Sequence, residues 1–412
     1  MTAFDVLKVR EDFPMVKQIM NGKPLIYLDT AATSQKPWAV IEAISSFYAE
    51  SYGTVHRAIY DLSARSTEKY NEVREKVRQF IGAKKVEEII FTRGATEAIN
   101  LVAHSFGRHF LKEGDEVILS EMEHHSNLIP WQLLSKERGI ILKVIPITDE
   151  GNLNLDAFEK LLSKKTRLIA LTHLSNVLGT INPIKEITER AHAVGAKVMI
   201  DGAQAASHLA LNVQSLDVDF YLFSGHKLYG PTGIGVLYGK EELLEKMPPF
   251  MGGGDMVESV TLEASTFQPP PLRFEAGTPS IAEVIGLGAA IDYINAIGKE
   301  ECHTHLHALQ QDAAWKLSSI RGLKLIGTAA QKGPILSFFI EGVHALDLGT
   351  MLGLKGIAIR TGHLCAQPLL NRFKQRSLAR LSFGIYNTFD EIEKACSAIR
   401  EIIQSLNPNL LG

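Results

Sequence analysis

The stretch Phe220-Tyr221-Leu222-Phe223-Ser224-Gly225-His226-Lys227 joins four apolar residues to a polar segment that ends in a lysine. The turn-rich Gly230-Pro231-Thr232-Gly233 follows it. A second apolar run, Val198-Met199-Ile200, ends in a similar way at Asp201. Short apolar runs that stop at turn residues are typical of buried strands. We therefore predict two strands, with Lys227 at the end of one and Asp201 at the end of the other.

Similar apolar runs alternate with helical patterns through the first two-thirds of the chain. Such alternation predicts an α/β fold with a mainly parallel sheet, in which ligands gather at the carboxyl ends of the strands. The predicted strands cover residues 89–91, 116–119, 143–146, 168–171, 197–200 and 220–223, and helical patterns cover 155–162 and 184–194.

The pattern changes after Pro279. Two long helices are predicted first, and short strands and further helices follow, as in a smaller α+β unit. The helices cover residues 281–297, 299–317, 347–354 and 390–406, and the strands cover 323–326, 335–339 and 357–359. The Gly252–Gly254 and Pro269–Pro271 runs indicate an irregular loop. We predict a large domain over 21–280, a small C-terminal domain over 281–412, and an N-terminal segment, 1–20, that packs with the small domain.

Composition excludes several classes of protein. With 412 residues, the chain is long enough for two domains, and its 45% hydrophobic and 22% charged content is that of a globular protein. A net charge of -3 gives no reason to expect nucleic acid or an anionic membrane as partner. No apolar run approaches the roughly eighteen residues of a membrane span, and the N-terminus does not resemble a secretory signal. Three widely spaced cysteines, Cys302, Cys365 and Cys396, indicate a reducing compartment, which we expect to be the cytoplasm.

Lys227 and Asp201 together suit a particular cofactor. A lysine at a strand end can form a Schiff base with an aldehyde. Pyridoxal 5'-phosphate (PLP) needs such a lysine and also an acid that keeps its ring nitrogen protonated. The chain offers both groups in strand-end positions, and this pair predicts a PLP enzyme.

A phosphate site is predicted where a strand gives way to a helix. In Gly94-Ala95-Thr96-Glu97-Ala98, free backbone amides and the hydroxyl of Thr96 suit an anion. The alternative is an ordinary helix cap with Thr96 as N-cap. Ser224 and His226, next to the lysine, are further candidate phosphate donors.

Other polar residues at strand ends could contact the ring. In Glu123-His124-His125-Ser126-Asn127, one imidazole could stack on the pyridine and act as acid or base. Gln204 follows Asp201 by about one helical turn and could reach the phenolic oxygen. Asn176 is another amide at a strand end.

A candidate nucleophile lies in Arg360-Thr361-Gly362-His363-Leu364-Cys365-Ala366-Gln367-Pro368. We predict a polar loop here, after a strand over 357–359, with Arg360 and His363 close enough to favour the thiolate. Most free cysteines are small buried residues, and Cys302 and Cys396 fit that description because both lie in helical patterns.

These motifs resemble the cysteine desulfurases of the class V aminotransferase group, which have fold type I of the PLP enzymes. The match is closest to the SufS-like branch, which includes selenocysteine lyase activity. The resemblance runs from Tyr27 to Thr388 and is most specific over residues 174–183, 223–238 and 360–368.

The resemblance implies a homodimer that converts L-cysteine to L-alanine and leaves sulfur on Cys365, for transfer to an acceptor in iron–sulfur cluster assembly. L-selenocysteine is the alternative substrate. By the same resemblance, His124 would stack on the ring and Arg380, with Arg360 nearby, would hold the substrate carboxylate. The other implied cofactor contacts are Lys227, Asp201, Gln204, Thr96, Ser224 and His226, together with Thr278, which would reach the partner's cofactor. We also predict that Asn176 contacts the cofactor and the substrate.

Two departures from the family are visible. Relatives often have Arg-Ala-Ser where this chain has Arg380-Leu381-Ser382, and we expect Leu381 to add bulk beside the carboxylate site. Relatives that use a zinc-containing scaffold carry a histidine two residues after the one matching His344, where this chain has Leu346. A SufE-like acceptor is therefore favoured.

Three other interpretations stay open. An aminotransferase would use the same Lys227 but would leave Cys365 without a task. The run Cys302-His303-Thr304-His305-Leu306-His307 could bind a metal through His303 and His307, although a solvated helix face is the simpler explanation. A nucleotide-binding dehydrogenase fits poorly, because the glycine-rich stretch 233–239 lacks the Gly-x-Gly-x-x-Gly spacing and opens no helix.

Overall fold

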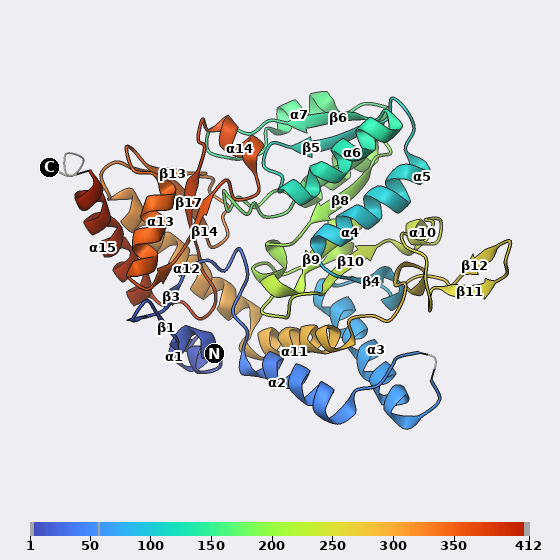
Figure 1. Cartoon of the computed structure of the whole chain (residues 1–412). Helices are drawn as coiled ribbons and strands as arrows, with labels where there is room; N and C mark the ends of the chain where they lie inside the picture. The colour runs from blue at the N-terminus through green and yellow to red at the C-terminus, as the bar shows by residue number, and fades with distance from the viewer. Residues whose placement is uncertain (1–3, 57, 408–412) are drawn as a thin grey trace.

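The computed structural model describes residues 4–56 and 58–407. The predicted N-terminal segment and small domain extend over 1–3 and 408–412, which lie outside the described residues. Figure 1 shows a larger part formed mainly by the first two-thirds of the chain beside a smaller part formed by the C-terminal third. Helix α1 (Val6–Glu11) lies against the smaller part, where Val9 joins its apolar core.

A seven-stranded sheet forms the centre of the larger part, in the order β4-β10-β9-β8-β7-β5-β6. Strands from β9 to β6 run parallel, whereas β10 is antiparallel to both of its neighbours. The predicted α/β fold with a mainly parallel sheet is confirmed. The strands are β4 (Ile89–Thr92), β5 (Glu116–Ser120), β6 (Ile141–Ile145), β7 (Thr166–Thr172), β8 (Lys197–Asp201), β9 (Phe220–Ser224) and β10 (Gly235–Gly239).

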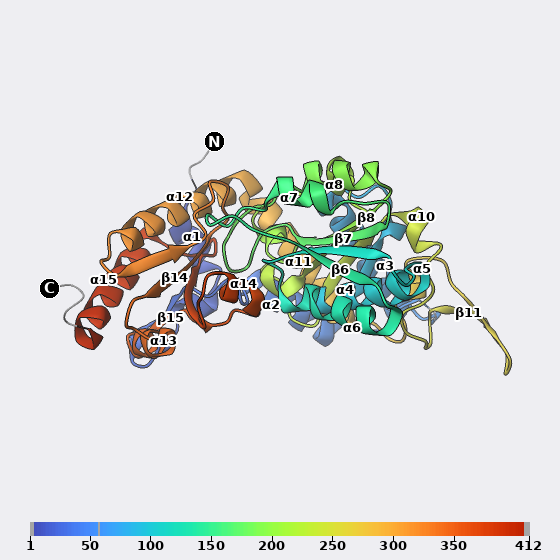
Figure 2. The same ribbon diagram turned by 90° about the horizontal axis from the view of Figure 1, so that it is seen from above.

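Helices cover both faces of this sheet, with α7 and α8 on one side and α4, α5 and α6 on the other (Figure 2). Successive strand side chains point to opposite faces, so Ile169 packs in one core and Leu168 and Ala170 in the other. Burial on both faces explains why the inner parallel strands are largely apolar, whereas the edge strand β6 exposes Ile141 and Val144. The helices of this part are α2 (Trp38–Ser46), α3 (Asp61–Ile81), α4 (Ala95–Leu101), α5 (Arg108–Phe110), α6 (Ile129–Arg138), α7 (Leu155–Leu161), α8 (Ile184–Ala193), α9 (Val213–Leu216) and α10 (Glu241–Leu244).

Two segments differ from the prediction. The glycine-rich stretch 233–239 contains the buried strand β10. Only three apolar residues lie between its two glycines, which is too short a run to show a hydrophobic pattern. The predicted loop between Gly252 and Pro271 contains a hairpin, β11 (Val257–Val260) and β12 (Ser265–Phe267), that projects from the molecule (Figure 1). Most of the side chains of the hairpin are exposed, so no core imposes an apolar pattern on them.

The smaller part contains an antiparallel sheet in the order β13-β14-β17-β16. The predicted strand at 357–359 divides in two, because β15 (Ile357–Ala358) pairs with β3 (Ile26–Tyr27) and β16 (Arg360–Gly362) joins the sheet. Arg360 is therefore in a strand and not in the predicted loop. The remaining elements are β1 (Ile19–Met20), β2 (Lys23–Pro24), β13 (Leu323–Ile326), β14 (Ile335–Ile340), β17 (Leu378–Ser382), α13 (Ala345–Leu354), α14 (Gln367–Arg372) and α15 (Phe389–Leu406).

Helices α11 (Ile281–Ile297) and α12 (Lys299–Ser318) lead from the larger part into the smaller one. They meet at Gly298, where the chain bends by 80°. Among the described residues, no single helix has the length and hydropathy to cross a membrane, and only this bent pair passes when its two helices are taken together. In this fold, α11 is apolar because Val284, Leu287 and Ile291 pack in the core of the larger part.

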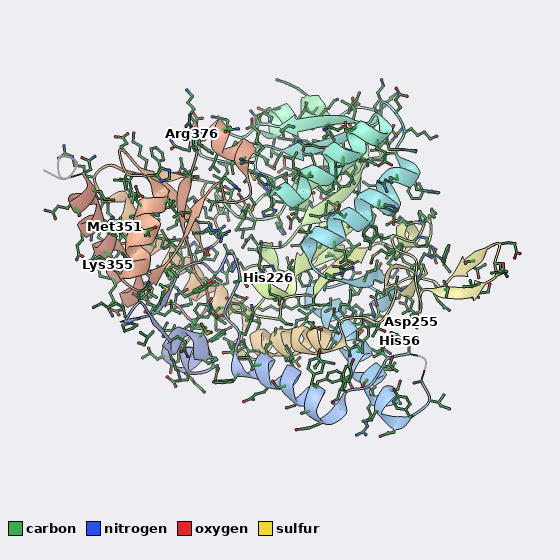
Figure 3. The ribbon with its side chains drawn as sticks, viewed as in Figure 1. His56, His226, Asp255, Met351, Lys355 and Arg376 are labelled. Carbon is green, nitrogen blue, oxygen red and sulfur yellow. The ribbon has the colours of Figure 1, made fainter. Side chains whose placement is uncertain are left out.

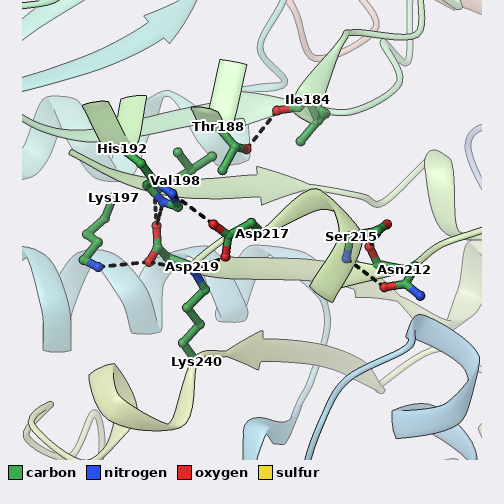
Figure 4. A network of polar contacts seen from close by, with 10 residues as sticks. All are labelled: Ile184, Thr188, His192, Lys197, Val198, Asn212, Ser215, Asp217, Asp219 and Lys240. Atoms are coloured by element: carbon green, nitrogen blue, oxygen red, sulfur yellow. Dashed lines mark hydrogen bonds and ion pairs between the residues drawn. The ribbon is translucent and has the colours of Figure 1, made fainter. Parts of the chain in front are cut away.

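Charges at the amino ends of the strands stabilise the fold at the edge opposite the predicted site. The carboxylate of Asp219 is fully buried and accepts hydrogen bonds from the backbone of Val198 at 2.8 Å and from His192 Nε2 at 2.8 Å (Figure 4). Lys197 Nζ lies 3.1 Å from the same carboxylate. A buried carboxylate with this many donors is satisfied within the protein and holds β8 and β9 together at their starts.

We predict that Gly235→Ala lowers the free energy of unfolding by roughly 1–3 kcal/mol. An added Cβ would lie 2.5 Å from Gly94 Cα and 2.7 Å from Gly94 C, and backbone atoms cannot move aside as a flexible side chain can. Urea-induced unfolding would measure the change. The matched control is Gly252→Ala, whose Cβ meets nothing within 4 Å; equal stability of the two variants would contradict the prediction.

Candidate active site

Nearly all of the predicted site residues line one cavity of about 240 Å³, at the carboxyl edge of the large sheet. A neighbouring cavity of about 550 Å³ is larger, but it lacks Lys227, Asp201 and Cys365. His226, labelled in Figure 3, borders both and lies where the two parts of the molecule meet. The predicted residues in the smaller cavity are Thr96, His124, Asn176, Asp201, Gln204, Ser224, His226, Lys227, Arg360, Cys365 and Arg380.

Lys227 reaches this cavity from a tight turn after β9. The turn, Gly225–Lys227, is closed by hydrogen bonds from Leu228 N and Gly230 N to Gly225 O, at 2.9 and 3.0 Å. Burial lowers the pKa of the Lys227 amine, and the carboxylate of Asp201 opposes this shift. A lowered pKa makes the neutral, nucleophilic amine more accessible than in an exposed lysine.

Asp201 ends β8 and is almost completely buried. Its Oδ1 accepts a hydrogen bond from Ala203 N at 2.9 Å. Burial raises the pKa of this carboxyl, while that hydrogen bond and the charge of Lys227 lower it. Within the described part of the chain, Asp201 forms no ion pair with another residue, so it can accept a protonated ring nitrogen from a ligand.

The predicted phosphate end of the cavity lies between α4 and the turn after β9. Ala95 N donates to Ser224 Oγ at 2.8 Å, and His226 Nδ1 lies 3.2 Å from Thr33 Oγ1. The alternative in which Thr96 is an N-cap is wrong, because α4 begins at Ala95 and Gly94 occupies the cap position. The hydroxyl of Thr96 therefore belongs to the first turn of the helix and borders the cavity.

His124 is held in a single orientation by its own turn. Its Nδ1 accepts a hydrogen bond from Ser126 N at 3.1 Å and lies 2.8 Å from Ser126 Oγ. Burial, with the charge of Lys227, lowers the pKa of His124 to about 4. At neutral pH the ring is therefore uncharged and its proton is on Nε2, and the residue lines the cavity.

Gln204 and Asn176 are anchored by hydrogen bonds to other loops of the site. Gln204 Nε2 donates to Ala31 O at 2.7 Å, and Asn176 Nδ2 donates to Leu364 O at 2.8 Å. Asn176 thereby joins the loop after β7 to the loop that contains Cys365. Gln204 keeps its carbonyl oxygen and one N–H for a ligand.

Glu123 is not among the predicted site residues, but it is next to His124 in the chain and is buried, with 2% of its surface exposed. Its carboxyl accepts hydrogen bonds from Ser120 Oγ, Asn127 Nδ2 and Thr172 N at 2.5, 2.7 and 3.1 Å. Burial raises its pKa to about 8, although these donors oppose the shift. An acidic residue shortly after the buried strand β5 was the available signal, but the functional role was assigned to the neighbouring His124.

The loop with Cys365 is held from both sides. His125 N donates to Cys365 O at 2.8 Å, and Gln367 N donates to His125 Nε2 at 3.1 Å. Leu364 and Cys365 both have left-handed backbones, with φ of 54° and 55°. Two consecutive non-glycine residues in this region cost about 1 kcal/mol or more each, and the surrounding contacts must supply that energy.

Arg380 and Arg360 lie opposite each other on β17 and β16. Arg380 Nη2 contacts Asp29 Oδ1 at 2.9 Å and Nη1 donates to Asn176 O at 3.0 Å. Its Nε is buried and has no hydrogen-bond partner among the described residues. Two guanidinium groups with one carboxylate between them leave an unpaired donor and excess positive charge, which suits a second carboxylate from a substrate.

The expectation for Leu381 is wrong. Because successive residues of a strand point to opposite faces, Leu381 faces away from Arg380 and packs with Leu336 and Phe338 in the core of the smaller part. It does not line the cavity. Its bulk is accommodated in that core.

Thr278 lies apart from the other predicted residues. It borders a separate cavity of about 230 Å³ together with Arg93 and Glu275. Glu275 anchors this segment. Its carboxylate accepts hydrogen bonds from Nη1 and Nη2 of the buried Arg74, at 2.7 and 2.8 Å, and from Phe91 N at 2.7 Å. Thr278 is therefore held on the outside of its own site, and its predicted contact with a partner's cofactor stays a prediction.

The predicted metal alternative has little geometric support. The rings of His303 and His307 on α12 stack with centroids 6.2 Å apart. Among the described residues, however, they belong to no group of three or more His, Cys, Asp or Glu ligands within 4.8 Å of one another.

Comparison with known proteins identifies a family. The aminotransferase class-V family model matches residues 26–395. A cysteine desulfurase of Synechococcus elongatus is 51% identical over 399 residues, which cover 97% of this chain and 64% of that protein, and one of Dickeya dadantii is 50% identical, with 97% of each chain covered. The chain thus spans less than two thirds of the first of these relatives. The crystal structure of the cysteine desulfurase CsdA from Escherichia coli has a TM-score of 0.91 at 40% identity and covers 98% of this chain and 100% of that one.

We predict that Glu123→Gln destabilises the protein by about 1–3 kcal/mol. The amide NH₂ of glutamine would face either Thr172 N or the NH₂ of Asn127, and two donors cannot pair. Asn127 cannot turn its amide without cost, because its Oδ1 accepts Trp131 Nε1 at 3.1 Å. Thermal unfolding would measure the effect against Glu113→Gln, an exposed control; a Glu123 variant as stable as this control would refute the argument.

Proposed function

Because this chain belongs to the aminotransferase class-V family, we propose that it is a PLP-dependent cysteine desulfurase. The substrate is L-cysteine, the product is L-alanine, and the sulfur stays on Cys365 as a persulfide. The observation on which the proposal rests is that Cys365, Lys227 and Arg380 line the same cavity. An aminotransferase would need Lys227 but would leave Cys365 unused.

The residues of the cavity fit PLP. Lys227 would hold its aldehyde carbon and the buried carboxylate of Asp201 would pair with its ring nitrogen. His124 would cover the ring with its flat face, Gln204 would contact the phenolic oxygen, and Thr96, Ser224 and His226 would bind the phosphate. When bound, PLP supplies an electron sink for negative charge on the substrate Cα.

Arg380 would position the substrate carboxylate through its unpartnered Nε, and Arg360 on the neighbouring strand would add positive charge. Asp29 and Asn176 O keep the guanidinium of Arg380 from turning away. A fixed guanidinium that pairs with a carboxylate orients the substrate as well as binding it.

The chemistry of the chain's own residues follows from these positions. The Lys227 amine, released when the substrate amine takes its place, would remove the Cα proton, and the Cys365 thiolate would attack the substrate sulfur. The substrate C–S bond breaks and a C–H bond replaces it, while the two sulfur atoms form an S–S bond. The balance is L-cysteine plus the Cys365 thiol giving L-alanine plus the Cys365 persulfide, and no external oxidant or reductant is needed.

The persulfide would pass to an acceptor protein for iron–sulfur cluster assembly, and a SufE-like acceptor is favoured over a zinc scaffold because Leu346 replaces the second histidine. Leu346 is exposed in the first turn of α13, next to His344. Direct comparison of the two acceptor types in sulfur-transfer assays distinguishes them.

A homodimer is part of the proposal. Thr278 borders a separate cavity from that of Lys227, and this position supports the proposal that it contacts a partner's cofactor. Exposed apolar side chains between α2 and α3, among them Tyr48, Tyr52 and Ile59, offer a surface that a second copy would cover. Three unpaired cysteines support a reducing location such as the cytoplasm.

The proposal is tested by recording the absorption spectrum of the purified protein before and after adding L-cysteine. We expect the band of bound PLP to shift, alanine to accumulate and sulfur to appear on the protein. Lys227→Ala should give no turnover. A protein that stays colourless after incubation with PLP would overturn the proposal, and faster turnover of L-selenocysteine than of L-cysteine would assign the lyase activity instead.

We predict that Cys365→Ala keeps its bound PLP and colour but forms alanine from L-cysteine more than roughly 100-fold more slowly, because the nucleophile is missing. Cys396→Ala is the control, since Cys396 is buried in α15 away from the cavity. Alanine formation by the Cys365 variant near the control rate would remove Cys365 from the mechanism.

A further inference from the structure

A cluster of three potential metal ligands lies on the outer side of the cysteine loop. His125, His363 and Cys365 each offer one ligand atom, and these three atoms lie within 4.8 Å of one another. In residues 4–56 and 58–407, no other group of three or more His, Cys, Asp or Glu side chains is this close. The cluster joins the loop after β5 to the loop after β16.

Backbone contacts fix the relative positions of the three residues. His125 N donates to Cys365 O at 2.8 Å, and Cys365 N donates to His363 Nδ1 at 3.2 Å. The two imidazole rings lie 5.6 Å apart between centroids. Because the backbone bond from His125 N to Cys365 O does not involve the rings, and His363 lies two residues from Cys365, the three ligands would require little reorganisation to meet at one ion.

Both rings already present an unprotonated nitrogen. Nε2 of His125 accepts a hydrogen from Gln367 N, and Nδ1 of His363 accepts one from Cys365 N. An ion bound at these nitrogens would replace one long N–H···N hydrogen bond at each ring. Neutral imidazole and thiolate are the ligand forms that zinc and cadmium require.

The position of the cluster gives an ion access without passing through the substrate cavity. Cys365 lines that cavity, but His125 and His363 do not. His363 is exposed, and His125 and Cys365 are half-buried. Cys365 therefore lies between the substrate cavity and the histidine pair.

We propose that His125, His363 and Cys365 form a binding site for a single thiophilic divalent ion such as Zn²⁺ or Cd²⁺. One thiolate and two imidazoles are a ligand set suited to these ions, and a tetrahedral centre with three protein ligands leaves a fourth position for water or an incoming thiol. Binding converts the Cys365 thiol and M²⁺ to a metal thiolate and one released proton. This site goes beyond the proposed desulfurase activity and does not depend on it.

The site would control the availability of the thiol. A metal-bound Cys365 directs its lone pairs to the ion, so it reacts more slowly with alkylating reagents and with a substrate sulfur. Removal of the ion by a chelator restores the free thiol. The site therefore makes Cys365 reversibly sensitive to thiophilic metals.

The test is titration of the PLP-loaded protein with Cd²⁺ alone, in a buffer free of thiols and phosphate. We expect one Cd²⁺ per chain and an ultraviolet thiolate-to-cadmium charge-transfer band. Cys365→Ser should abolish the band, and His125→Gln and His363→Gln should each weaken binding at least ~10-fold. The circular dichroism spectrum of each variant, measured in parallel, shows that it is folded.

The matched control is the double variant His303→Gln with His307→Gln, which removes the exposed histidine pair of α12 and should bind Cd²⁺ as the unaltered protein does. Absence of the band, a band that survives Cys365→Ser, or unchanged affinity in both His125→Gln and His363→Gln would overturn the proposal. Because no turnover is measured, each of these outcomes leaves the proposed desulfurase activity untouched.

Discussion

A buried amine and a buried carboxylate in one cavity form the constraint on which the site depends. Burial shifts Lys227 and Asp201 toward their neutral forms, and each opposes that shift in the other. Neither has an ion-pair partner among the described residues. Such an arrangement is costly unless a ligand pairs with it, and a ring with a positive nitrogen at one end and a reactive aldehyde near the other satisfies both groups. The large sheet fixes their spacing, because β8 and β9 are neighbouring parallel strands.

The cysteine loop is held in place by hydrogen bonds between the two parts of the molecule. Cys365 belongs to the smaller part of the molecule, but its loop is bonded to two loops of the larger part through His125 N and Asn176 Nδ2. The backbone carbonyl oxygen of Asn176 also accepts a hydrogen bond from Arg380 Nη1. One residue therefore positions both the cysteine loop and the guanidinium group. The left-handed backbone at Leu364 and Cys365 persists because these bonds leave the loop no relaxed alternative.

Much of the fold is predictable from local patterns. The inner parallel strands β5, β7, β8 and β9 are buried on both faces, so their apolar runs can be recognised without an alignment. Strand β10 is not predicted, because glycines flank its short apolar centre. The hairpin β11–β12 is not predicted either, because its side chains are mostly exposed and therefore show no apolar pattern. The predicted strand at 357–359 is divided by its partners, because β15 pairs with β3 and β16 pairs with β17. No local sequence signal separates two adjacent short strands that belong to different sheets.

The sequence alone determined the chemistry that is available. Strand-end residues identified Lys227, Asp201 and the other polar groups, because parallel strands carry such residues to one edge. The motif around Cys365 indicated a nucleophile.

Only the tertiary structure decided which of these groups meet. Arg380 lies beside Asp29, and Leu381 points into the core of the smaller part. Thr278 borders a different cavity, and Glu123 is buried. His125 and His363 lie close to Cys365. These outcomes depend on side-chain direction and on contacts between different elements of the fold, and local sequence patterns contain neither.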